Sequence, residues 1–292
     1  MKKKASIIST IVLIIILLVG LSVMLYPAVS DWWNTREQKR AIENYQAVIY
    51  QLDDGETERL LAEAREYNRK IAGVYSPFTN YDSVPGYEDI LNISGTGIMG
   101  YISIPVIKAE FPIYHGTSAE VLNVAAGHLQ GSSLPVGGFD THAVISAHRG
   151  LPSAKLFTDL DKLVVGDTFT ITVLDRVLTY EVEEILIVKP EELDKLAIVP
   201  ERDYVTLMTC TPYGVNTHRL LLRSHRIDTV YSHDVKVVAD AVQVDPMLVV
   251  PLISAPLVVG LIGFWIFGEK KRKRFVPNKN MMYKLFEKKE GD

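Results

Sequence analysis

The chain has 292 residues, of which 48% are hydrophobic, so it is long enough for one large or two small domains and too apolar to be disordered or collagen-like. Its formal net charge of −4 is unevenly distributed: residues 1–26 carry +3, residues 269–292 carry +5, and residues 27–246 therefore carry −12. Because such an acidic segment lacks the basic surface that nucleic-acid binding requires, we expect no nucleic-acid partner.

Two uncharged apolar runs, residues 7–26 and 247–268, each match the ~20 residues that a helix needs to cross a bilayer. A cleaved signal peptide is the alternative for the first run, but its length exceeds the ~7–15 apolar residues of a signal and favours an uncleaved anchor. A buried core helix is the alternative for the second run, but the basic residues 270–274 follow it at once, as at a cytoplasmic flank. We expect a cell-membrane protein with both termini in the cytoplasm, including the basic tail 269–292, and with residues 27–246 extracellular.

Residues 27–72 are predicted to be helical, with apolar stripes that break at Asp53-Asp54-Gly55 into an amphipathic helical hairpin packed on the main domain. The stripes are Ile42, Tyr45, Ile49 and Leu52, followed by Leu60, Ala64, Tyr67 and Ile71. Residues 73–93 are rich in Gly and Pro and show no period, so they are predicted to form a long irregular segment.

Residues 94–228 contain short apolar and β-branched runs separated by turn residues, a pattern typical of a mainly β barrel or sandwich. The predicted strands are Met99–Ile104, Glu110–Tyr114, Ala143–Ala147, Thr168–Val173, Leu178–Val188, Tyr204–Thr209 and Arg219–Ser224. Residues 229–246 connect this region to the second anchor and have room for a short helix.

Cys210 is the single cysteine, which excludes an intrachain disulfide, and it ends a predicted strand. Arg219 begins the next strand nine residues later; if the two strands pair, its guanidinium lies near the thiol and could stabilise a thiolate or an oxyanion. A thiol nucleophile also needs a base or an ion-pair partner, and His148, which follows another predicted strand, is the best placed of the seven histidines.

Residue types alone favour a different interpretation, in which Cys210 is a small buried hydrophobe and each histidine is a packing or surface residue. The remaining histidines are His115, His128, His142, His218, His225 and His233, and we expect His142, His218 and His225 to tolerate Ala or Gln better than His148 does. No pair of His or Cys residues has the spacing of a zinc site, so we expect no metal and no cofactor.

Residues 206–210 (TLMTC) with Arg219 resemble the TLxTC…R signature of the sortases. Further stretches resemble the class C, pilus-building sortases in particular: residues 113–117 (IYHGT), 132–138 (SSLPVGG), 146–152 (SAHRGLP) and 210–220 (CTPYGVNTHRL). The resemblance is close over residues 90–228 and extends to the plan of two membrane anchors and an N-terminal helical region. It implies an eight-stranded catalytic β-barrel at residues 94–228.

The resemblance also implies a cysteine transpeptidase. Cys210 would attack the Thr carbonyl of an LPxTG-like sorting signal and form a thioester. His148 would be the general acid for the leaving amine and then the base for the incoming one, while Arg219 would hold the substrate and the oxyanion. Thr209 is a hypothetical substrate-binding residue. The expected partners are pilin subunits that carry sorting signals and acceptor lysines, and a lipid bilayer crossed by the two transmembrane helices.

Class C sortases carry a lid with an Asp-Pro-aromatic motif, whose Asp typically faces the catalytic Arg. The matching stretch here is Ser76-Pro77-Phe78, in which Ser replaces the Asp. Our hypothesis is that Phe78 covers the catalytic thiol and that the closed lid is weaker because its ion pair is missing. The alternative is that residues 73–89 form a loose linker without a gating role.

Two other functions use the same residues. A non-catalytic assembly factor would bind sorting signals without turnover, although intact Cys210, His148 and Arg219 argue against it. A hydrolytic thiol protease would share the site and differ only in using water as the acceptor.

Overall fold

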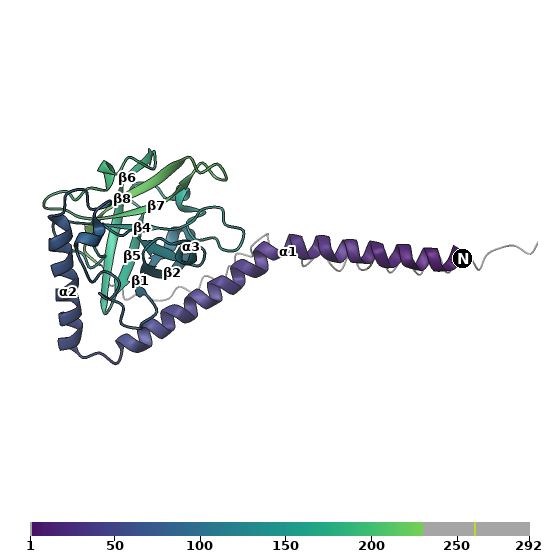
Figure 1. Ribbon diagram of the computed structural model, residues 1–292, viewed down its shortest axis with the longest axis horizontal. Coiled ribbons are helices and arrows are strands. Elements are labelled where there is room, and N and C mark those ends of the chain that lie inside the picture. The colour runs from purple at the N-terminus through teal and green to yellow at the C-terminus, as the bar shows by residue number, and fades with distance from the viewer. Residues whose placement is uncertain (1, 230–259, 261–292) are drawn as a thin grey trace, which may run out of the picture. The chain divides into compact units, whose positions relative to one another are not determined.

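A computed structural model describes residues 2–229 and residue 260 (Figure 1). The described residues belong to two units, one containing residues 2–25 and the other residues 26–229. The predicted second anchor, apart from Gly260, the basic tail 269–292 and the connector beyond Thr229 lie outside the described residues.

The first helix, α1 (Lys2–Ile49), begins in the N-terminal apolar run. From Thr10 onward it contains an 18-residue window whose mean hydropathy is 2.7 and none of which is buried in protein. In the part of the chain that the structure describes, α1 is the one helix long and apolar enough to cross a membrane.

The helical hairpin breaks where the sequence predicts, between α1 and α2 (Asp54–Ala72). Asp53 caps α2, because its side chain accepts a hydrogen bond from the Glu56 N–H at 2.8 Å and so satisfies a donor that has no partner within the helix. Five side chains of the two helices are at most 2% exposed: Tyr45, Leu61, Ala64, Tyr67 and Ile71. The predicted stripe is thus largely correct, except that Leu61 replaces Leu60 as the fully buried leucine of α2.

Eight strands close into a barrel in the order β1-β2-β3-β4-β7-β8-β6-β5, which confirms the predicted fold (Figure 1). The pairs β2–β3 and β4–β7 are parallel, and all other neighbours are antiparallel. The strands are β1 (Ile98–Ile104), β2 (Ala109–His115), β3 (Ala126–His128), β4 (Thr141–Ser146), β5 (Thr168–Val173), β6 (Arg176–Val188), β7 (Asp203–Thr211) and β8 (His218–Ile227).

Short helical turns occupy several connections of the barrel. They are η1 (Tyr81–Ser83), η2 (Pro105–Ile107), α3 (Ala119–Leu122), η3 (Leu160–Lys162) and η4 (Asp194–Leu196). Between α2 and β1, η1 is the one regular element, so this segment is as irregular as its composition predicts.

The barrel strands bury apolar side chains on two faces. On β7, Val205 and Leu207 belong to the main core inside the barrel, which also includes the buried face of α2. Because side chains alternate along a strand, Met208 lies on the opposite face, where it packs against a second apolar cluster. We call this set the outer-face cluster: Val144, Val188, Leu196 and Leu221, with Phe78, Leu129, Leu186, Leu193 and Met208 packed against them.

Candidate active site

The predicted pairing of the cysteine and arginine strands is confirmed. Cys210 on β7 is the register partner of Arg219 on β8, one pair before the end of a ladder that runs from Tyr204 and His225 to Thr211 and His218. Directly opposite residues of an antiparallel pair have Cβ atoms about 5 Å apart, so a guanidinium on β8 reaches the environment of the thiol. Cys210 is partly exposed, as a nucleophile must be.

His148 follows the end of β4, on the other side of β7. The parallel register pairs Thr141 with Asp203 and Ser146 with Met208, a constant offset of 62 residues. A hydrogen bond from the Ala147 N–H to the Met208 carbonyl, 3.2 Å long, extends this alignment beyond the strand. The same offset sets His148 level with Cys210, so that three neighbouring strands bring the three predicted catalytic residues to one end of the sheet.

Thr209 lies inside this arrangement and not on its surface. Its side chain is 2% exposed, and its hydroxyl donates a hydrogen bond of 2.8 Å to the Ala147 carbonyl. The bond joins the residue before Cys210 to the residue before His148. The hypothesis that the Thr209 side chain contacts the substrate is therefore replaced by one in which its hydroxyl fixes the spacing of the two strand ends.

Arg149 is a residue of the site that the sequence analysis did not single out. One guanidinium nitrogen donates to the Thr211 hydroxyl at 3.3 Å, and another forms an ion pair with Asp161. The guanidinium carbon also lies 6.0 Å from the centre of the Tyr213 ring, a cation–π distance. Its side chain is only 10% exposed, so Arg149 ties the segment after His148 to the segment after Cys210. The sequence signal that could have identified Arg149 is its position, as a cation immediately after the candidate histidine.

Arg219 itself makes few protein contacts. Its Nη1 donates to the backbone carbonyls of Asn216 at 3.4 Å and His218 at 3.2 Å. No carboxylate pairs with it among the residues that the structure describes. A guanidinium has five N–H donors, so most of this planar donor set remains for a ligand.

The lid-like stretch packs beside the site. Phe78 contacts the outer-face cluster, to which Met208, two residues before Cys210, also belongs. Ser76 has a left-handed backbone (φ 50°), and its carbonyl accepts hydrogen bonds from the N–H groups of Thr79 and Asn80 in a tight turn. The stretch borders a cavity of about 410 Å³, whose wall includes Ser76, Pro77, Phe78, Gly131, Leu193 and Leu196.

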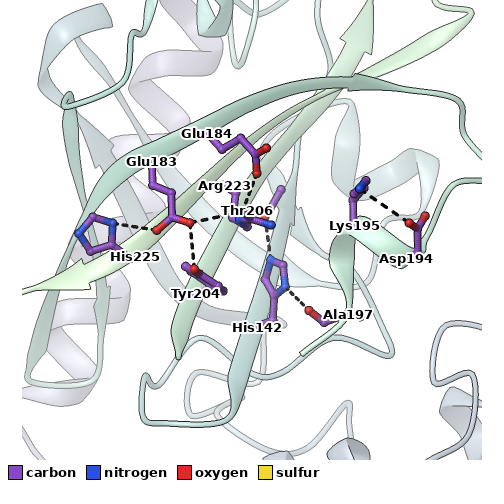
Figure 2. Close-up of polar contacts among 10 residues, drawn as sticks. All are labelled: His142, Glu183, Glu184, Asp194, Lys195, Ala197, Tyr204, Thr206, Arg223 and His225. Carbon is purple, nitrogen blue, oxygen red and sulfur yellow. Dashed lines mark hydrogen bonds and ion pairs between the residues drawn. The ribbon is translucent and has the colours of Figure 1, made fainter. Parts of the chain in front are cut away.

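His142 is a buried residue with two polar partners, and the expectation that it tolerates substitution better than His148 stays a prediction. Its side chain is fully buried, its Nδ1 contacts the Ala197 carbonyl at 2.9 Å, and its Nε2 contacts the Thr206 hydroxyl at 2.7 Å (Figure 2). Burial lowers the pKa of His142 to about 4, so the ring is neutral at pH 7. Replacing it with Ala would leave both polar partners unsatisfied.

The other histidines also have partners away from Cys210. His128 is fully buried against the Tyr87 hydroxyl, and burial lowers its pKa to about 4. His115 is held between two backbone carbonyls, and His218 contacts the Thr217 hydroxyl. His225 lies 3.3 Å from the Glu183 carboxylate (Figure 2), and His233 lies outside the described residues.

Charged side chains of β6 and β8 form a network farther along the same outer face (Figure 2). Arg223 forms ion pairs with Glu184 at 2.6 Å and with Glu183 at 3.3 Å, and the Tyr204 hydroxyl donates to Glu183 at 2.9 Å. Two of these residues face each other in the β6–β8 register. The charged groups of this network pair with one another. The outer-face cluster lies between the network and the end of the sheet that carries Cys210.

Within residues 2–229, no three His, Cys, Asp or Glu side chains gather into a group that could hold a metal ion. Cys210, His148 and Arg219 form the arrangement of a thiol nucleophile with an imidazole after one neighbouring strand and a guanidinium on the other.

Comparison with known proteins agrees with this geometry. The family described as "Sortase domain" matches residues 102–227. Sortase C1 from Streptococcus agalactiae is 48% identical, with 65% of this chain and 100% of that chain covered and a TM-score of 0.60. The chain belongs to the sortase family.

Two further sortase structures are similar. One, described as "Sortase C1 of GBS Pilus Island 1", is 40% identical over 66% of this sortase and 94% of that chain, with a TM-score of 0.59. The other is Clostridium perfringens sortase C with the C-terminal cell wall sorting motif, 43% identical over 65% and 99% of the two chains, with a TM-score of 0.57. The matched structures are class C sortases, and this sortase is an enzyme of the cysteine transpeptidase type. Its apolar α1 fits membrane anchoring.

Proposed function

We propose that this sortase cleaves an LPxTG-like sorting signal through a thioester on Cys210 and transfers the acyl group to a lysine amine of a pilin, thereby polymerising pili. The observation that carries the proposal is the alignment of His148, Cys210 and Arg219 on three neighbouring strand ends. The similarity to sortase C1 structures, one of them described by its pilus island, supports the pilin as substrate.

The first half-reaction forms the acyl-enzyme. The Cys210 sulfur attacks the Thr carbonyl carbon of the signal, and Arg219 donates N–H groups to the developing oxyanion. When the C–N bond breaks, His148 gives a proton to the departing amine, which leaves as the free N-terminus of the cleaved peptide. The Thr acyl group remains as a thioester.

The second half-reaction transfers the acyl group. A pilin lysine amine attacks the thioester carbonyl, His148 accepts a proton from the amine, and the Cys210 thiolate leaves. The new bond is an isopeptide bond between two subunits. A thioester conserves the energy of the broken amide, so the exchange of one amide for another needs no external energy source.

The outer-face cluster forms the surface on which the apolar residues of the sorting signal pack. It lies on the same face as Cys210 and presents partly buried side chains such as Met208 and Leu186. Burying a Leu side chain against such a surface contributes about 2 kcal/mol. Phe78 already packs there, so we propose that the lid competes with the signal and that it moves aside when substrate binds.

The proposed location follows from the substrate. The enzyme would be held in the cell membrane by α1 and by the second apolar run, with both termini in the cytoplasm and the barrel outside. This arrangement keeps the barrel on the side of the membrane where exported pilins emerge.

Product analysis tests the proposal. Full-length enzyme in detergent is incubated with a pilin bearing a sorting signal and an acceptor lysine, and the products are sequenced by mass spectrometry. We expect Lys–Thr isopeptide junctions that are absent with Cys210→Ala. Hydrolysed signal without any junction would identify a thiol protease, and bound but uncleaved signal would identify a non-catalytic assembly factor.

A further inference from the structure

The segment that follows His148 forms a closed loop, residues 148–158. At its neck the Phe157 N–H donates to the His148 carbonyl at 3.1 Å, and the Gly150 N–H donates to the Thr158 hydroxyl at 3.1 Å. Phe157 is fully buried in the main core, which fixes one side of the neck. We call this segment the His148 loop; its tip is residues 153–155.

The tip of the His148 loop is held by α1. The Asn34 amide donates from Nδ2 to the Ser153 carbonyl at 2.8 Å. One turn earlier in the helix, the Asp31 carboxylate accepts a hydrogen bond of 2.8 Å from the Lys155 N–H. Each contact joins segments more than 100 residues apart, and together they satisfy a donor and an acceptor of the loop backbone.

These contacts belong to a continuous face of α1. The same face carries Gln38, which donates to the Val124 carbonyl at 2.6 Å, and Tyr45, whose hydroxyl donates to the Met99 carbonyl at 3.0 Å. Their successive spacings of three, four and seven residues place them on one side of a helix. Through these bonds α1 holds backbone groups of the barrel and its loops, and Asp31 and Asn34 hold the loop that follows His148.

We propose that Asp31 and Asn34 are positioning residues for His148, so that the anchoring helix holds the imidazole in register with Cys210. The inference rests on the proposed role of His148. Proton transfer to the leaving amine depends on heavy-atom distances of about 3 Å, and a misplacement of about 1 Å can reduce a rate by as much as 100-fold. A loop tip released from α1 loosens the backbone that carries the imidazole.

Two isosteric changes test the proposal with opposite predictions. Asn34→Asp removes the amide donor and sets a carboxylate against the Ser153 carbonyl, whereas Asp31→Asn keeps an oxygen that accepts from Lys155. Both change the charge by one, so an effect of charge alone would appear in both variants. Asp31→Ala removes the acceptor, and Lys39→Ala, on the exposed side of α1, is the matched control.

The full-length enzyme in nanodiscs is assayed for acylation by a sorting-signal peptide, and its amide hydrogen exchange is measured over residues 150–158. We expect about a tenfold fall in the acylation rate constant for Asn34→Asp and Asp31→Ala, with KM unchanged and faster exchange at the loop tip. Asp31→Asn and Lys39→Ala should match wild type.

The inference would be overturned if Asn34→Asp acylated and exchanged at wild-type rates. It would also be overturned if Asp31→Asn lost as much of the acylation rate as Asn34→Asp. Failure of the proposed function would give a different result in the acylation assay. In that case the wild-type enzyme forms no thioester, while the exchange at Lys155 still shows whether α1 holds the loop.

Discussion

The hydrogen bond between Thr209 and Ala147 makes the sharpest prediction about how the barrel assembles its site. Thr209→Val keeps the shape of the side chain but removes the hydroxyl, which leaves the buried Ala147 carbonyl without its donor. The loss of a buried hydrogen bond and the unsatisfied acceptor together cost about 2 kcal/mol. For a unit of this size, that free energy corresponds to a fall in Tm of about 4–8 °C. The acylation rate should fall as well, because the bond spaces His148 from Cys210.

Calorimetry and single-turnover acylation measure the two effects on the same variant. Thr172→Val is the matched control, because Thr172 is also a buried strand residue and its hydroxyl makes no hydrogen bond within residues 2–229. That control should keep its Tm within about 1 °C and its acylation rate. A Thr209→Val enzyme that unfolds and acylates like wild type would refute the reasoning.

Three further changes test other parts of the site. Arg219→Lys keeps the charge but loses the planar fork, so kcat/KM for the sorting peptide should fall about 100-fold, and near-normal turnover would count against an oxyanion role. Phe78→Ala should speed alkylation of Cys210 by a small thiol reagent, and an unchanged rate would eliminate the lid. Burial lowers the pKa of His142 from 6.5 to about 4, so its contribution to stability is complete above pH 6.5 and is lost as the pH falls toward 4. Urea titrations should show His142→Gln losing about 2 kcal/mol less than wild type between pH 7.5 and pH 5, and parallel pH curves would contradict this role.

Much of the barrel could be predicted from sequence because its long strands alternate apolar and polar residues. Thr168–Val173 was predicted with its observed bounds, and the other long strands within a few residues. The exception is β3, whose three residues Ala126–His128 contain no β-branched or aromatic side chain and too few positions to show a period. Its pairing depends on β2 and β4, which are distant in sequence.

The docking face of α1 could not be predicted for a related reason. The apolar stripe at Ile42 and Tyr45 continues toward the N-terminus as Gln38, Asn34 and Asp31, which are polar and therefore look like a solvated face. In the structure they bind backbone groups of loops, and no pattern in the sequence reveals which backbone groups lack partners.

The candidate catalytic residues were proposed from their places at strand ends and from the resemblance to the sortases, but the residues that hold them in position were not predicted. Thr209 was a hypothetical substrate-binding residue. Alternation along β7 instead turns its side chain inward, away from the face of Cys210. Arg149 gained its role from tertiary contacts with Asp161, twelve residues away, and with Tyr213, more than sixty residues away in the sequence.

The most direct test of the account is the intact mass of the full-length enzyme after mixing with a sorting-signal peptide in the absence of any amine acceptor. The account predicts an adduct with the mass of the peptide up to its Thr, located on Cys210, released by hydroxylamine and absent in Cys210→Ala. Cleavage of the peptide without an adduct on Cys210, or continued cleavage by Cys210→Ala, would contradict it.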